Sequence, residues 1–455
     1  MQKNRSVNQS TEEPTEISDG KHREKSRIGY ACVTVAVPET ALRTCTSRFA
    51  TEKNLREIIA HNLDALYNQC AYNIAHRILL FRISSDIVPF AGTPVNTLDW
   101  EVIFNEKFRR IGERIRSSGM RVSMHPGQYT VLNSPDPRVV ENAVSDLEWH
   151  GRFLDALNVS QENKIILHVG GVYGDKSAAM NRFSENFRRL SAGTRSRVVI
   201  ENDERSFSVT DVLGLHDEIG VPVVYDNLHR EVFEGRFTEP DPGNQMVYPA
   251  ETHREMIIRC RKTWSKTDGR QKIHYSQQDT GKRAGAHSET IRSAEFMRFY
   301  DTIRDIAPDI MLEVKDKNLS AVKCVLLTEE NSVIKSLEEE WSRYKYLIME
   351  RSPENYTGIR KLFAENKVIR PIDFYALAED AMDRAEDPGR SENAALHVWG
   401  YFSGKVTESE KRGFFKRLDA YRDGRAALSG VKSYLFRLAG RYGETYLLNS
   451  LYFYL

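Results

Sequence analysis

The amino-acid sequence predicts an α/β protein, a (β/α)8 barrel of the TIM type followed by a smaller all-helical domain. Three observations predict this class. Eight short segments of apolar and β-branched residues recur between positions 28 and 316, stretches with helical periodicity separate them, and a region with helical patterns but no strands follows. Eight strand–helix units over roughly 290 residues match the usual size of such a barrel.

The eight segments are nearly continuous apolar runs, as parallel strands buried on both faces require. In chain order they are RIGYACVTVAV from Arg27, RILLFRISS from Arg77, RVSMHP from Arg121, KIILHVGG from Lys164, RVVIEND from Arg197, VPVVYDNLH from Val221, KIHYSQQD from Lys272 and IMLEVKD from Ile310. Between the runs, stretches such as Phe104–Arg116 and Val209–Ile219 have apolar residues at helical spacing. The repeated order of strand, helix and strand predicts parallel pairing through right-handed crossovers.

Histidines and carboxylates stand at or just beyond the ends of most of these runs. The chemistry of such a barrel is done at the carboxyl ends of its strands. We therefore expect these residues on one rim: Tyr30, Arg82, His125, His168, Glu201, Asp226 with His229, Lys272 with His274, and Glu313. Imidazole and carboxylate bind divalent ions such as Zn²⁺ and Mn²⁺. So many candidate ligands predict more than one ion, and neighbouring ions can activate water and stabilise the leaving oxygen in phosphodiester cleavage.

Each of these residues also has a purely structural interpretation. A lone histidine at a strand end is more often a hydrogen-bonded polar residue than a ligand, and His287, in the loop GAHSE, means little alone. Asp226 and His229 (DNLH) could be a strand end followed by a helix cap. Glu201 could form a buried ion pair with an arginine, because an ionised carboxylate there needs a partner charge or a metal. The joint pattern favours the metal site.

The composition is typical of an enzyme with more than one domain. The 455 residues include 65 basic and 64 acidic side chains, a net charge of +1, so any surface that binds nucleic acid has to be local. The five cysteines are scattered without a paired spacing, which predicts reduced thiols and a cytoplasmic protein, associated with the nucleoid if the source is prokaryotic. No apolar run of about 18 residues is present, so no membrane span is expected.

Three regions are predicted along the chain. Residues 1–26 are polar and charged and indicate a disordered tail, residues 27–330 the barrel, and residues 335–455 the helical domain. Residues 233–250 hold three prolines and two glycines and predict a long loop after the sixth strand, on the rim where loops shape the substrate surface. The many tyrosines and phenylalanines of the helical domain are more typical of a small helical core than of a base-stacking surface.

Six motifs in chain order resemble the ultraviolet damage endonuclease family. They are FRISSDIVPF from Phe81, HPGQY from His125, IEND from Ile200, YDNLH from Tyr225, KIHYS from Lys272 and MLEVKDK from Met311. The resemblance covers the chain from about Arg27 to Cys324 and implies a barrel of the endonuclease IV kind. It implies two or three divalent ions, with Mn²⁺ the leading candidate and Zn²⁺ or Mg²⁺ as alternatives. It also implies that duplex DNA is nicked immediately 5′ of ultraviolet photoproducts.

The resemblance assigns the metal ligands and the catalytic residues. The implied ligands are His125, His168, Glu201, Asp226, His229, His274, His287 and Glu313. Glu201, Lys272 and His229 take the catalytic roles, with Glu201 central enough to bridge two ions. Lys272 matches a family lysine that can be carboxylated, and its place two residues before His274 puts both side chains on one face of the strand.

The resemblance also assigns contacts with the lesion, and two positions depart from the family pattern. Gln128 and Tyr129 match a pair that wedges into the duplex opposite the lesion, and Tyr30 is a further predicted lesion contact. Thr34 stands where a probing asparagine usually follows Tyr30 by four residues, so an amide donor is lost. Thr93, in AGTPV, stands where a histidine usually lies near the rim. The implied reaction is attack of a metal-activated hydroxide on phosphorus, which gives a 3′ hydroxyl and a 5′ phosphate.

The last region has a resemblance of its own. WSRYKYLIMERSPENY from Trp341, NAALHVWGYFSGKVTESEK from Asn393 and LDAYRDG from Leu418 are similar to the YbgA-type domain of unknown function, over about residues 335–455. No activity is implied, and help in DNA binding or docking of a partner is the hypothesis. Three alternatives stay open for the barrel: an endonuclease acting at abasic sites, a sugar enzyme of the xylose isomerase type, and a damage-binding protein whose metal site has decayed.

Overall fold

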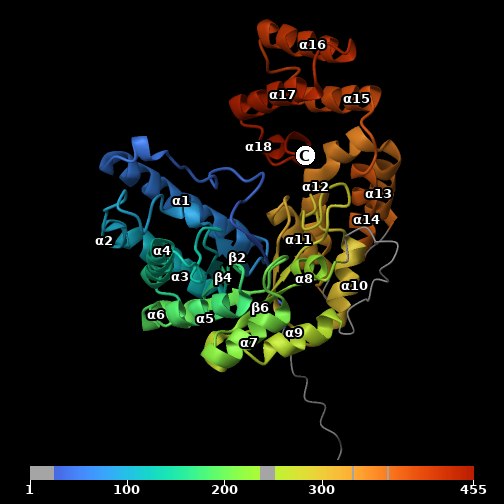
Figure 1. Ribbon diagram of the computed structural model, residues 1–455. Coiled ribbons are helices and arrows are strands. Elements are labelled where there is room, and N and C mark those ends of the chain that lie inside the picture. Colours follow the sequence, from blue (N-terminus) through green and yellow to red (C-terminus); the bar gives the residue numbers. More distant parts are fainter. Residues whose placement is uncertain (1–24, 236–251, 330–332, 366–367) are drawn as a thin grey trace, which may run out of the picture.

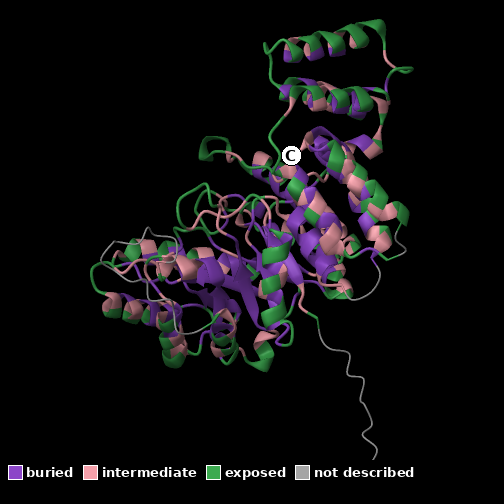
Figure 2. Ribbon diagram, turned by 90° about the vertical axis from the view of Figure 1, so that its right-hand side faces the viewer, coloured by how far each residue is buried: buried purple, intermediate pink, exposed green. Residues whose placement is uncertain are grey.

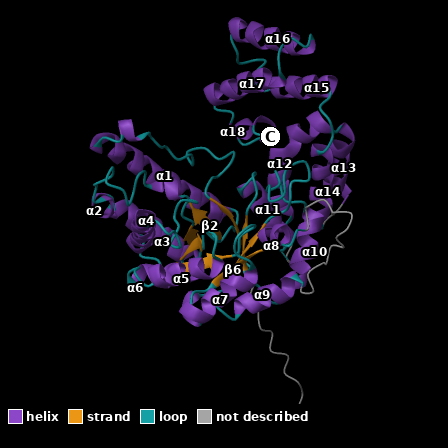
Figure 3. Cartoon of the chain, in the orientation of Figure 1, coloured by secondary structure: helices purple, strands orange, loops and turns teal. Residues whose placement is uncertain are grey.

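Eight parallel strands close into a barrel in chain order, which confirms the predicted fold class (Figure 3). The structure is a computed structural model that describes residues 25–235, 252–329, 333–365 and 368–455. The strands are β1 Ile28–Ala31, β2 Leu80–Ile83, β3 Arg121–Met124, β4 Lys164–His168, β5 Val198–Glu201, β6 Val223–Asp226, β7 Lys272–Tyr275 and β8 Asp309–Leu312. The barrel closes where β8 pairs with β1, with Tyr30 opposite Leu312.

The strands are shorter than the apolar runs that predicted them. β1 ends at Ala31 because Cys32 turns the chain with a positive φ of 69°. β3 ends at Met124 and β8 at Leu312, so His125 and Glu313 each lie one residue beyond their strands. The rim therefore consists of strand ends together with the first residues of the loops.

Helices surround the barrel (Figure 1). They are α1 Glu52–Ala75, α2 Trp100–Ile103, α3 Asn105–Ser118, α4 Pro137–Ala156, α5 Lys176–Phe187, α6 Ala192–Arg197, α7 Val209–Ile219, α8 Asn227–Phe233, α9 His253–Arg261, α10 Ser293–Ile303 and α11 Asn318–Leu327. The helix predicted over Phe104–Arg116 is α3, which stops at Gly119 in the left-handed conformation. α7 has the predicted bounds, because Ser208 and Asp211 form a capping box at its start and Gly220 is left-handed at its end.

Buried ion pairs hold the amino-terminal end of the barrel. Asp309, at the start of β8, is fully buried and accepts hydrogen bonds from Arg27 Nε at 3.1 Å and Arg121 Nη1 at 2.9 Å. Lys164, at the start of β4, is fully buried and donates to Asp268 Oδ1 at 2.6 Å. Apart from Arg82 and His168, which are partly exposed, the strands are buried (Figure 2), and a charge at such a depth is tolerated only when it is paired.

A helical region follows the barrel and extends away from it on one side (Figure 1). Its helices are α12 Ile334–Arg351, α13 Pro353–Glu365, α14 Pro371–Met382, α15 Pro388–Trp399, α16 Glu408–Arg422, α17 Leu428–Tyr442 and α18 Thr445–Leu448. Its all-helical character agrees with the prediction. The hydrophobic core of the barrel continues into α12 and α14 through Leu337, Tyr344 and Phe374, whereas Tyr346 and Met349 of the same α12 belong to a second core with α15–α18. The predicted domain limits at 330 and 335 stay a prediction.

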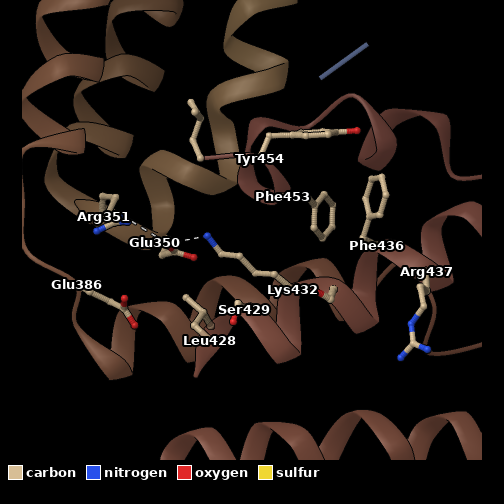
Figure 4. A pocket seen from close by; sticks show the side chains of 12 residues that line it. Glu350, Arg351, Glu386, Leu428, Ser429, Lys432, Phe436, Arg437, Phe453 and Tyr454 are labelled. Carbon is tan, nitrogen blue, oxygen red and sulfur yellow. Dashed lines mark hydrogen bonds and ion pairs between the residues drawn. The ribbon is translucent and has the colours of Figure 1, made fainter. Parts of the chain in front are cut away.

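A pocket lies where α12 meets α17 (Figure 4). The buried Glu350 accepts a hydrogen bond from Lys432 Nζ at 3.1 Å, and Phe436, Phe453 and Tyr454 line the apolar side. Burial raises the pKa of Glu350, although the charge of Lys432 opposes the change. The ion pair joins the helix that starts at the barrel to the second core.

Two predictions lie largely outside the described residues. Of the predicted tail, 1–26, the structure describes only residues 25 and 26, and of the predicted loop, 233–250, only residues 233–235.

The described helices include none that is both long enough and apolar enough to cross a membrane.

Candidate metal centre

Seven of the eight predicted metal ligands lie close together at the carboxyl ends of the strands. They form three groups, within each of which the ligand atoms lie within 4.8 Å of one another: His125, His168 and Glu201; Glu201, Asp226 and His229; and Asp226, His274 and Glu313. Glu201 and Asp226 each belong to two groups, which is the arrangement that neighbouring ions require. His287 lies outside these groups, with its Nε2 3.9 Å from Glu313 Oε2.

Glu201 stands at the centre of the site with four imidazoles around it. Its side chain is 1% exposed. The four nearest imidazole nitrogens, with their distances to a Glu201 carboxylate oxygen, are His274 Nδ1 at 2.8 Å, His229 Nδ1 at 3.5 Å, His125 Nε2 at 3.5 Å and His168 Nε2 at 3.9 Å. The arginine of the rim, Arg82, pairs with Glu313 instead. Glu201 is therefore surrounded by candidate ligands and does not form the arginine ion pair that was the alternative.

Glu313 forms the second end of the site. Its Oε1 accepts a hydrogen bond from Arg82 Nη1 at 2.5 Å and lies 3.4 Å from His274 Nδ1. Burial disfavours the ionised carboxylate, but the positive charges of Arg82 and His274 outweigh burial and lower the pKa of Glu313. Glu313 is therefore ionised at neutral pH, as a metal ligand has to be.

Asp226 ends β6 and also caps α8. Its Oδ1 accepts from the backbone N–H of His229 at 2.7 Å. Asn202 holds both residues, because its Oδ1 accepts from Asp226 N at 2.9 Å and its carbonyl oxygen lies 3.0 Å from His229 Nδ1. The helix-cap interpretation of DNLH is correct, and it is compatible with metal binding because the cap uses one carboxylate oxygen and leaves the other.

Unpaired buried atoms test whether these residues fit a metal. Glu201 Oε2, Asp226 Oδ2 and His274 Nε2 are buried and have no hydrogen-bond partner among the described residues. An unpaired buried polar atom costs about 1–3 kcal/mol, so such atoms are uncommon. Two carboxylate oxygens and one imidazole nitrogen left unpaired in one place are a donor set for a divalent ion. The residues therefore fit the predicted metal cluster.

Burial and neighbouring charges move the pKa values of His168 and His229 in opposite directions. Burial lowers the pKa of His168 to about 4, against the opposing charge of Glu201, so this imidazole is neutral at pH 7. Burial also acts to lower the pKa of His229, but Asp226 and Glu201 raise it to about 10. His229 therefore has to lose a proton before it can bind an ion, whereas His168 does not.

Lys272 is the first residue of β7. It was predicted to lie at the carboxyl end of the strand, and that placement is wrong. It stands two residues before His274, which places it about 7 Å deeper along the strand. Its ammonium nitrogen is buried and has no hydrogen-bond partner among the described residues. Burial, followed by the nearby charge of Arg121, lowers the pKa of Lys272 well below its usual value. The side chain lies in the barrel interior beneath the rim, and its catalytic role stays a prediction.

Tyr30 is buried between the barrel and α1, and its predicted contact with the lesion stays a prediction. The ring is fully buried and packs on Phe81 at 5.1 Å between centroids. The hydroxyl donates to Asn73 Oδ1 at 2.9 Å and lies 2.7 Å from Thr34 Oγ1. The threonine that departs from the family pattern is therefore buried and bonded to Tyr30. In this structure the Tyr30 ring and hydroxyl present no surface to solvent.

The predicted wedge residues project from the loop after β3. Tyr129 is 82% exposed, and Gln128 is exposed beside it. A hydrogen bond of 3.0 Å from Thr130 N to Gly127 O closes the turn that presents them. Thr93, the second departure, is exposed and donates its hydroxyl to Phe90 O at 2.8 Å, a bond within its own turn.

Sequence reasoning missed residues that contact the candidate ligands His125 and His229. Ser85 Oγ donates to the carbonyl oxygen of His125 at 3.0 Å and lies 2.9 Å from Nε2 of the buried His150. Glu204 Oε2 lies 3.9 Å from His229 Nε2. Ser85 and Glu204 lie within or next to the motifs FRISS and END, which could have indicated them, but His150 lies within a helix and carried no such signal.

The fold and the site together define the class of protein. It is an α/β barrel with a candidate metal centre, where four histidines and three acids lie at the carboxyl ends of eight parallel strands. Residues 26–342, more than half of the chain, match the family model described as UV-endonuclease UvdE. The chain belongs to this family and is an endonuclease. The resemblance found in the sequence motifs is therefore confirmed.

Named relatives cover most of the barrel. The UV DNA damage endonuclease of Clostridium perfringens (strain 13 / Type A) is 41% identical over 333 residues, which is 72% of this chain and 77% of that protein. The UV DNA damage endonuclease of Bacillus cereus (strain G9842) is 32% identical over 295 residues, 64% of this chain and 87% of that protein. The crystal structure of SacUVDE has a TM-score of 0.60 and 35% identity, and covers 69% of this chain and 99% of its own. Residues 345–455 match a model described as a protein of unknown function (DUF1722).

Proposed function

We propose that this protein is a metal-dependent DNA repair endonuclease that nicks the damaged strand immediately 5′ of ultraviolet photoproducts. It leaves a 3′ hydroxyl and a 5′ phosphate. The observation that carries the proposal is the set of unpaired buried ligand atoms around Glu201, beneath a rim from which Tyr129 projects. The relatives named UV DNA damage endonuclease support the substrate. The five free cysteines support the cytoplasmic setting, near the nucleoid in a prokaryote.

We assign the eight predicted ligands to a cluster of two or three ions, with Mn²⁺ first and Zn²⁺ or Mg²⁺ as alternatives. When bound, such ions supply activated water and neutralise charge on the phosphoryl oxygens. Glu201 joins the two sides of the cluster, because its two oxygens face different pairs of histidines. Arg82 keeps Glu313 ionised, and Asn202 holds the His229 ring in a fixed orientation. No nucleophilic side chain is needed for this chemistry.

A nicking assay tests the proposal. The substrate is a duplex with one defined cyclobutane dimer, incubated with Mn²⁺ or with chelator, and the cut is mapped to the nucleotide. We expect a metal-dependent cut directly 5′ of the dimer. Cleavage of an abasic duplex alone would contradict the lesion class and favour the abasic-site endonuclease. Cleavage of neither duplex would revive the sugar enzyme if the protein binds Mn²⁺, and the damage-binding protein with a decayed metal site if it does not.

The exposed Tyr129 is expected to contribute to the discrimination between damaged and intact duplex DNA and not to metal binding. Stacking of an aromatic ring on a base is worth about 1–3 kcal/mol. We therefore expect Tyr129→Ala to reduce the ratio of affinities for dimer-containing and intact duplex about tenfold, with the Mn²⁺ content unchanged. Tyr129→Phe keeps the ring and is expected to keep the ratio. An unchanged ratio in the alanine variant would remove the wedge assignment.

We further infer that Lys272 carries a carboxyl group. Burial favours the neutral amine, the form that attacks carbon dioxide, so that a nitrogen–carbon bond forms and one proton leaves. The resulting anion would lie near the charges of Arg82 and Arg121, which already act on Lys272. Protein equilibrated with ¹³C-bicarbonate should show a carbamate carbon by NMR that Lys272→Met lacks. If that resonance is absent, Lys272 is unmodified and the inference that it carries a carboxyl group is wrong.

A further inference from the structure

A residue of the helical region caps a helix of the barrel. α10 begins at Ser293, and its N-cap residue, Arg292, makes no side-chain capping bond. The carboxylate of Glu379 in α14 does so instead, since its Oε1 accepts from Ser293 N at 3.0 Å and from Ser293 Oγ at 2.7 Å. The first N–H groups of a helix lack partners within the helix, and a carboxylate also suits the positive end of the helix dipole.

The same carboxylate holds α11. Lys323 of α11 is 1% exposed, and its Nζ donates to Glu379 Oε1 at 2.8 Å and to Thr290 Oγ1 at 3.0 Å. At the exposed edge of this contact, Arg292 donates to both oxygens of Asp383 at 2.9 and 2.6 Å. Figure 1 shows α14 beside α10 and α11. Without Glu379, the buried ammonium of Lys323 would lose the carboxylate to which it donates.

The loops that precede these two helices carry His287 and Glu313. The loops are bonded to each other, because Lys315 N donates to Ser288 O at 3.2 Å and Asp316 N donates to Glu289 O at 3.0 Å. A third bond, from Ile291 N to Ser320 Oγ at 2.9 Å, continues the connection to the start of α11. The two loops therefore form one connected unit, with the candidate ligands at one end and Glu379 at the other.

We propose that Glu379 is a positioning residue of the nuclease site. From the helical region, it fixes the two loops and thereby holds the His287–Glu313 end of the metal cluster at its distance from Glu201. The inference rests on the proposed function for the metal roles of His287 and Glu313. The anchoring of the loops by α14 does not depend on those roles.

The test compares Glu379→Gln and Glu379→Ala with the unaltered full-length protein by hydrogen exchange without metal, Mn²⁺ calorimetry and steady-state nicking. We expect backbone amides in 277–293 and 313–320 to exchange about tenfold faster, with β3–β5 unchanged. Mn²⁺ affinity should fall about tenfold, as for other residues that orient ligands, and kcat should fall more than KM for DNA rises. The matched control is Asp380→Asn, whose bonds to Asn355 and Arg384 stay within the helical region, and it should behave as the unaltered protein.

Each outcome decides a separate point. Unaltered exchange in both loops would overturn the inference, and faster exchange with unaltered Mn²⁺ affinity would overturn the link to the cluster. If the Glu379 variants do not fold, Ser293→Ala replaces them, because it removes only the hydroxyl contact with Glu379. We expect the same loops to exchange faster in this variant, by a smaller factor. Unaltered exchange in Ser293→Ala would again overturn the inference. An unaltered protein that binds no Mn²⁺ would contradict the proposed function instead, and the exchange measurement would still decide the anchoring.

Discussion

Glu201→Gln is expected to abolish nicking while the fold is retained. Glutamine has nearly the same shape, so the four surrounding histidines keep their places, but the charge that joins the two sides of the cluster is lost. Metal ions stabilise the transition state of phosphodiester cleavage by several kcal/mol. Losing them corresponds to a fall in kcat of about a thousandfold or more.

Metal analysis and circular dichroism check this result. We expect the variant to bind fewer Mn²⁺ ions than the unaltered protein and to give the same far-ultraviolet spectrum. Glu218→Gln is the matched control, because Glu218 pairs with Arg188 on the outside of the barrel at 3.3 Å, with 42% of its side chain exposed. Full activity with full metal content in the Glu201 variant would end the assignment of Glu201 as the central ligand.

Asp309→Asn is expected to cause the largest loss of stability. Asp309 is fully buried, accepts from Arg27 and Arg121, and lies 3.8 Å from Arg270. Asparagine fills the same space, but it leaves the buried guanidinium of Arg121 without its counter-charge. Breaking a buried ion pair from one side costs about 3–5 kcal/mol.

Urea denaturation of the full-length protein measures the effect. Glu141→Gln is the control, since Glu141 pairs with Arg189 at the exposed surface, where such pairs contribute about 1 kcal/mol or less. An Asp309 variant as stable as the control variant would show that the guanidinium of Arg121 finds another partner, and that the ion pairs at this end of the barrel are not essential for the fold.

The barrel and most of its candidate ligands could be predicted from the sequence for one physical reason. Strands buried on both faces have to be apolar, so any charged or imidazole side chain at the end of such a run is conspicuous. His168, Glu201 and Asp226 are the last residues of their strands and were identified in this way. His287 lies in a loop, so it could be assigned only through the family resemblance.

The structure differs from the expectation where an apolar run does not show which way a side chain points or where its strand ends. Tyr30 lies one residue before the end of β1, yet its ring points into the core, where Asn73 of α1 satisfies its hydroxyl. Lys272 starts its strand, as it also starts its run in the sequence, so its place away from the carboxyl end could have been predicted. The cap that Glu379 provides joins residues 86 positions apart, and no local pattern indicates such a contact.

The continuity of α12 limits how the two parts of the chain can be recombined. The two family matches end at 342 and begin at 345, inside this single helix. Tyr344 packs in the core of the barrel, and Tyr346 packs in the second core. Insertion of one residue at the junction would rotate everything beyond it by about 100° around the helix axis and turn Leu347 and Ile348, which are buried in the core of the barrel, away from that core. A graft of this helical region onto another barrel therefore has to preserve the phase of the helix as well as the sequence on either side.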